Sequence, residues 1–65
     1  MALYDVYELD GATFRGPAAQ GNIPNPVSEV RQGDGTWKPY TGDRMKPVTF
    51  GDHVERREFG SGPTA

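Results

Sequence analysis

Residues 3–15 read LYDVYELDGATFR and contain the clearest local signal for structure in the chain. The first seven residues of this stretch are rich in β-branched and aromatic types and contain neither Gly nor Pro, which is typical of a strand. Asp10-Gly11 follows. Asp-Gly between two apolar runs favours a type I′ turn, because both central positions of that turn need positive φ. The stretch therefore predicts a β-hairpin with strands at 3–9 and 12–15.

Short strands and Gly/Pro-rich turns account for most of the remaining chain. Residues 16–26 contain three prolines and predict a loop, since each proline removes a backbone donor and disfavours helix in the residue before it. The pattern after this loop predicts three further strands, at 27–32, 36–40 and 45–50.

The segment 53–59 is compatible with two structures. As a helix it would have Asp52 as its N-cap, a capping box completed by Glu55, and Gly60 at its end. However, Val54 and Phe59 would then lie about 140° apart, at roughly 100° per residue, which makes a poor apolar face. We therefore expect a strand, with a short C-terminal helix at 53–59 in an α+β fold as the alternative.

These elements predict a mainly β fold. About five short strands would form a small antiparallel curled sheet or a partly open barrel, of the Src-homology-3-like or oligonucleotide-binding-like type. We expect a single domain over residues 1–60, followed by a disordered tail at 61–65.

Size and composition limit what such a chain can be. A domain of 65 residues buries only about 60% of the surface that its unfolded chain exposes. It has no cysteine, so neither a disulfide nor a thiolate metal site can stabilise it. No apolar stretch approaches the roughly 18 residues of a membrane span, and residues 1–5 do not resemble a signal peptide. We expect a cytoplasmic protein that does not enter a membrane.

The side chains that could carry chemistry are few. His53 is the only histidine, and a structural zinc site needs about four nitrogen or sulfur ligands. Ser28 and Ser61 lack the surroundings of an activated nucleophile. We therefore expect no enzymatic activity, no cofactor and no metal, and a structural or incidental role for His53.

The only tryptophan, Trp37, lies between two glycine-rich turns and marks the candidate binding surface. Together with nearby aromatic and basic residues it could bind single-stranded nucleic acid, by stacking bases and pairing with phosphates. The competing interpretation places Trp37 in the core, since so small a domain needs its largest side chain inside. The candidate surface consists of Trp37, Lys38, Tyr40, Arg44, Lys46 and Arg57.

Contacts with another protein are the function we favour. Tyr4 and Tyr7 are an odd number of residues apart and would lie on opposite faces of a strand. A sheet with aromatic residues on both faces has more apolar surface than one small core can cover. This indicates a protein partner or a homodimer. The net charge of −2 makes any binding to nucleic acid weak, so that role is the alternative.

Overall fold

The computed structural model describes residues 2–59, and these form five strands and one short helix. About 50% of the residues lie in strands, which confirms the predicted mainly β fold. The predicted tail at 61–65 lies outside the described residues. The elements are β1 (Ala2–Leu9), β2 (Ala12–Pro17), β3 (Glu29–Arg31), β4 (Trp37–Pro39), α1 (Lys46–Phe50) and β5 (Asp52–Phe59).

The first hairpin forms as predicted. Leu9 pairs with Ala12, which leaves Asp10 and Gly11 as the two residues of the turn. Their φ angles are 52° and 80°, so both have the positive φ that a type I′ turn requires. This turn sets the register of β1 against β2, and β2 continues to Pro17, two residues further than predicted.

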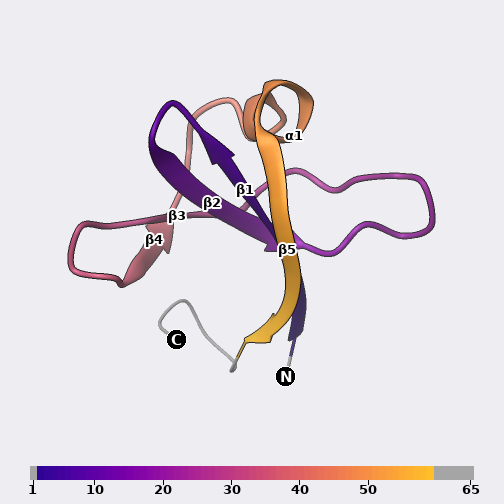
Figure 1. Ribbon diagram of the computed structural model, residues 1–65, viewed down its shortest axis with the longest axis horizontal. Coiled ribbons are helices and arrows are strands. Elements are labelled where there is room, and N and C mark those ends of the chain that lie inside the picture. The colour runs from indigo at the N-terminus through magenta and orange to yellow at the C-terminus, as the bar shows by residue number, and fades with distance from the viewer. Residues whose placement is uncertain (1, 60–65) are drawn as a thin grey trace.

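The five strands form one antiparallel sheet in the order β4-β3-β2-β1-β5. The first four follow one another as a meander. After α1 the chain returns, and β5 pairs with β1 from Ala2↔Phe59 to Glu8↔Asp52 (Figure 1). The sheet is not closed, so β4 and β5 are its two edges.

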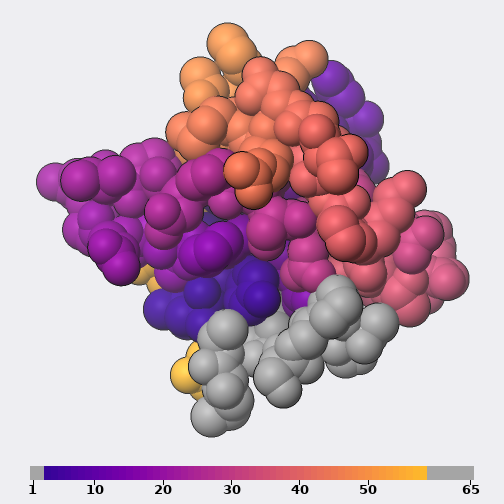
Figure 2. Space-filling model, turned by 180° about the vertical axis from the view of Figure 1, so that it is seen from behind, coloured from indigo at the N-terminus to yellow at the C-terminus, as the bar shows by residue number. Residues whose placement is uncertain are grey.

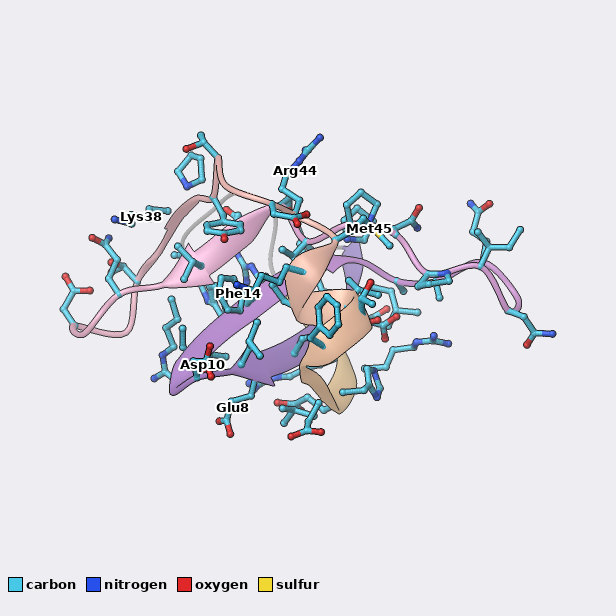
Figure 3. The ribbon with its side chains drawn as sticks, turned by 90° about the horizontal axis from the view of Figure 1, so that it is seen from above. Glu8, Asp10, Phe14, Lys38, Arg44 and Met45 are labelled. Atoms are coloured by element: carbon cyan, nitrogen blue, oxygen red, sulfur yellow. The ribbon has the colours of Figure 1, made fainter. Side chains whose placement is uncertain are left out.

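One face of the sheet is covered by α1 and by the long connection between β2 and β3. Figure 2 shows this side, with the connection in purple and magenta and the segment leading through α1 in orange. Phe14 of β2 is buried on this side of the sheet and lies near α1 (Figure 3). The buried residues of this core are Tyr7, Phe14 and Val27, with Leu9, Ala12, Val30, Tyr40 and Val48 packed against them.

Val27 reaches this core because the chain passes very close to β2. A Cβ atom on Gly16 would lie 2.6 Å from the Cα atom of Val27, so only glycine allows this approach. The N–H of Val27 donates to the carbonyl oxygen of Arg44 at 3.0 Å. Val27 is fully buried as a result.

The predicted strand at 45–50 is wrong, because most of this segment is the helix α1. Asp43 begins the turn that precedes it: its carboxylate accepts the N–H of Met45 at 3.2 Å, and its carbonyl oxygen accepts that of Lys46. Pro47 lies in the first helical turn, where a missing N–H costs nothing, whereas in a strand it would remove a ladder hydrogen bond. Local hydrogen bonding therefore overrides the short apolar pattern.

The strand prediction for the last segment is confirmed, and the alternative helix at 53–59 is wrong. Residues 52–59 form β5 and pair with β1, with one register shift beside Val6 and Tyr7. A helix here would have had no continuous apolar face to bury. As a strand, the segment gains backbone pairing along the full length of β1.

Asp5 connects β1 to both β5 and the long connection. Its side chain is 3% exposed and accepts hydrogen bonds from Arg56 Nε at 2.8 Å and from the backbone N–H of Ala19 at 2.8 Å. His53 Nε2 lies 3.0 Å from the same carboxylate. Hydrogen bonding to Arg56 is the largest of the effects that hold the pKa of Asp5 well below its usual range.

This carboxylate makes the stability of the fold depend on pH. Because the pKa of Asp5 is lowered in the folded state, its stabilising contribution is present above the unfolded pKa of about 3.9 and is lost as the pH falls below it. We expect Asp5→Asn to lower the free energy of unfolding at pH 7 by about 2 kcal/mol, since it removes the charge of a buried carboxylate that accepts hydrogen bonds from Arg56 and Ala19. The variant should also lose less stability than the wild type between pH 5 and pH 2, as measured by urea unfolding at each pH.

Asp10→Asn is the matched control, because Asp10 is exposed and asparagine suits its position in the turn. It should keep the acid sensitivity of the wild type. Parallel loss of stability on acidification in the wild type and in Asp5→Asn would show that Asp5 does not cause the pH dependence.

Candidate functional site

The second face of the sheet carries a different set of residues, and α1 does not cover it. Cross-strand partners have their side chains on the same face of a sheet. The partners on this face are Val6 with Arg15, Arg15 with Glu29, and Arg31 with Trp37. Glu55 and Arg57 of β5 join the same face opposite Val6 and Tyr4. This face therefore combines aromatic, aliphatic and charged groups from all five strands.

At its centre lies Arg15, whose side chain is fully buried. The guanidinium carbon lies 4.7 Å from the ring centroid of Tyr4 and 4.4 Å from that of Trp37, so the group is placed over two aromatic rings. Arg15 Nε donates to Glu29 Oε1 at 2.8 Å. Since Arg15 and Glu29 are direct cross-strand partners, the register of β2 and β3 brings the two charges together.

Trp37 reaches this centre because of the turn that precedes β4. The carboxylate of Asp34 accepts the hydroxyl of Thr36 at 2.6 Å and its backbone N–H at 3.0 Å. The Thr36 hydroxyl is the main cause of the lowered pKa of Asp34. Gly35 adopts φ 91°, which glycine tolerates without strain. The turn returns the chain so that Trp37 pairs with Arg31.

A groove of about 390 Å³ opens on this face. Val6, Trp37 and Val54 supply its apolar part, and Val54 is 54% exposed. Charged groups of both signs surround them, two acidic and two basic. The complete lining is Val6, Glu8, Thr13, Arg31, Gly35, Trp37, Val54, Glu55 and Arg57.

The charges around the groove are balanced. Glu8 and Glu55 oppose Arg31 and Arg57, and the nearest approach between Arg57 and Glu55 is 3.9 Å. Both groups of this ion pair are about half exposed, so it contributes little to stability. The groove can therefore contact apolar groups at its floor and groups of either charge at its rim.

The structure brings together two of the six residues of the predicted surface. Trp37 and Arg57 line the groove. Tyr40 packs on the opposite side of the sheet, with its ring centroid 4.9 Å from that of Phe14. Lys38, Arg44 and Lys46 are exposed, and Figure 3 shows Lys38 and Arg44 away from Glu8, which lines the groove.

Several residues that line the groove are not among the six residues of the predicted surface. Val6, Glu8 and Thr13 lie on one face because the Asp-Gly turn pairs Glu8 with Thr13. The shared face of these three residues can be predicted from the turn and from the alternation of side chains along a strand. Val54 and Glu55 required the pairing of β5 with β1, which the sequence did not indicate.

His53 lies on the covered side, where its ring centroid is 5.3 Å from that of Tyr7 in an edge-on arrangement. Within residues 2–59 there is no group of three or more His, Cys, Asp or Glu side chains that could hold a metal ion. The helix within this range is too short to cross a membrane.

Comparison of the chain with models of known protein families, with curated proteins and with solved structures finds no match.

The buried ion pair makes a specific prediction about stability. Arg15→Met leaves the carboxylate of Glu29 buried without its partner and should lower the free energy of unfolding by about 3 kcal/mol. The double variant Arg15→Met with Glu29→Leu removes both charges and leaves apolar groups beside Tyr4 and Trp37. It should recover most of the lost stability, as measured by urea unfolding followed through Trp37 fluorescence.

If the double variant were less stable than Arg15→Met alone, the charge of Glu29 would not be the source of the cost. If Arg15→Met cost less than about 1 kcal/mol, the ion pair and its stacking would not be central to the fold.

Proposed function

We propose that this domain is a small non-enzymatic binding module that holds a segment of another protein in the groove between β4 and β5. The observation that carries the proposal is the composition of the groove. An apolar floor, in which Val54 is 54% exposed, is surrounded by arginine and glutamate side chains. Arginine is enriched among the residues that contribute most to binding at protein interfaces.

The size of the groove supports this proposal. Its volume of about 390 Å³ lies within the roughly 300–1,000 Å³ of typical ligand pockets and would take a few side chains of a partner. The buried charged groups in the described part of the chain already have ionic partners: Asp5 pairs with the half-exposed Arg56, and Arg15 pairs with Glu29. This supports a structural rather than a catalytic role for them. We also propose a cytoplasmic location, in line with the cysteine-free sequence.

The observations give less support to binding of single-stranded nucleic acid. Trp37 is 8% exposed and already stacks on Arg15, so little of its ring can stack on a base. Tyr40, the second aromatic of that hypothesis, packs on Phe14 on the other side of the sheet. The groove has as many acidic as basic side chains at its rim, whereas a phosphate chain favours a positive groove.

Thr13→Arg tests the groove directly. Thr13 lines it from β2, and an arginine here would fill it and could pair with Glu8 on the neighbouring strand. We expect at least a tenfold loss of captured partner in a pull-down from lysate of the cells that make the protein. Thr49→Arg is the matched control, because Thr49 is exposed on α1 and should leave capture unchanged.

A photo-crosslinking residue placed at position 13 identifies what enters the groove. We expect a protein crosslink that survives nuclease treatment and is absent when the crosslinker is at position 49. Equal crosslinking from both positions would contradict the groove as the binding site. A crosslinked species that disappears with nuclease would favour the nucleic-acid alternative.

A further inference from the structure

We propose that β5 pairs antiparallel with β5 of a second copy of the chain, with Arg56 at the two-fold axis and Glu55 opposite Arg57 of the second copy. This inference goes beyond the proposed function, because it concerns the edge of the sheet and does not depend on what enters the groove.

The two edges of the sheet differ in their capacity to pair. β4 has three residues and ends at Pro39, which has no backbone N–H to offer a further strand. β5 has eight residues and contains neither Gly nor Pro. Its residues 52–58 are all exposed. The long edge is therefore the one that can accept another strand.

The register shows which backbone groups of β5 point outward. Leu9 and Ala12 flank the two-residue turn and so form a hydrogen-bonded pair, after which such pairs alternate along the ladder. The odd residues of β1 therefore bond to β2; in agreement, the carbonyl oxygen of Leu3 accepts the N–H of Ala18 at 3.0 Å.

The even residues of β1 then bond to β5, so Tyr4 pairs by hydrogen bonds with Arg57 and Val6 with Glu55. It follows that the backbone N–H and C=O groups of Arg56 and Glu58 point away from β1. A second β5 strand can hydrogen-bond to them. If the two-fold axis passes beside Arg56, then Arg56 of one copy and Arg56 of the second copy form a hydrogen-bonded pair.

The charges fit this register. With Arg56 opposite Arg56, Glu55 of each copy lies opposite Arg57 of the other. These positions are non-hydrogen-bonded pairs, in which the Cα atoms are only about 4.5 Å apart and the side chains are close. The symmetry therefore forms two ion pairs between Glu55 and Arg57, one on each side of the axis. Cross-strand pairs of opposite charge stabilise a sheet.

The other face of the same pairing brings the two Arg56 side chains together. Each is already held by a carboxylate of its own copy, because Arg56 Nε and one terminal nitrogen donate to the two oxygens of Asp5 at 2.8 and 3.2 Å. Asp5 thus offsets the repulsion at the axis. The paired sheets place two grooves on one continuous face, with Glu55 and Arg57 of both copies between them.

Charge reversal tests this register. Glu55→Arg places two arginines opposite each other across the interface, and Arg57→Glu places two glutamates there. We expect the wild type to have twice the 7.1 kDa mass of one chain in sedimentation equilibrium at about 1 mM. Each variant alone should dimerise at least about tenfold more weakly. Circular dichroism checks that the fold of each variant is unchanged.

An equimolar mixture of the two variants is the decisive sample. One carries arginine at both positions and the other glutamate at both, so a mixed dimer would have two complementary pairs. We expect the mixture to dimerise at least as strongly as the wild type. The double variant Glu55→Arg with Arg57→Glu should also dimerise, because exchanging both charges restores the opposite pairs.

Two further variants separate this interface from other surfaces. Glu58→Pro removes an outward backbone N–H and should weaken the dimer, whereas Lys38→Glu on β4 should not. Thr13→Arg should dimerise like the wild type, so failure of the groove proposal and failure of this one are distinguishable. A wild type that stays monomeric at about 1 mM, or a dimer that tolerates both charge reversals, would overturn the inference.

Discussion

The fold depends on a guanidinium group buried in the middle of a very small sheet. Arg15 is fully buried, lies over the rings of Tyr4 and Trp37, and donates to Glu29. Burying an isolated charge in a protein interior is costly, so the group is stable there only while all of these contacts form together. Tyr4, Arg15, Glu29 and Trp37 come from four different strands, so the contacts that Arg15 makes with the other three link those strands.

This constraint also explains why the two faces of the sheet differ. The chain has enough residues to cover one face, with α1 and the connection that carries Val27, and a core of apolar side chains forms there. On the second face, the long side chain of Arg15 and two aromatic rings fill the centre in place of a second layer. The groove lies on this second face, where Val6 and Trp37 are buried at its floor and Val54 is 54% exposed. The proposed protein partner would contact this second face, whereas pairing through β5 would use the edge of the sheet.

Parts of the fold could be predicted because they depend on neighbouring residues. The Asp10-Gly11 turn needs only two positive φ angles, and the strand at β5 follows from the poor helical placement of Val54 and Phe59. The segment 45–50 was predicted wrongly, because the hydrogen bonds of Asp43 with the two residues at the start of α1 outweigh a short apolar pattern. The predicted surface includes Lys38 and Tyr40 because they are close to Trp37 in the sequence. In the structure, Tyr40 packs edge-on against Phe14, whereas Trp37 stacks against the guanidinium group of Arg15.

The central pair could not be predicted at all. Arg15 and Glu29 are fourteen residues apart and separated by an irregular connection, so no local pattern aligns them. A charged residue in a short chain is normally expected at the surface.

The spacing between Trp37 and Tyr40 did indicate that they lie apart, because residues three apart on an extended strand point to opposite faces.

Nuclear magnetic resonance of the arginine side chains of the wild-type protein measures directly whether Arg15 is buried between the two rings. If Arg15 is buried between the two rings, its Nε–H proton should exchange with water far more slowly than those of the exposed arginines. The same proton should give nuclear Overhauser contacts to the rings of Tyr4 and Trp37. Exchange as fast as that of Arg44, with no contact to either ring, would show that Arg15 is not buried between them.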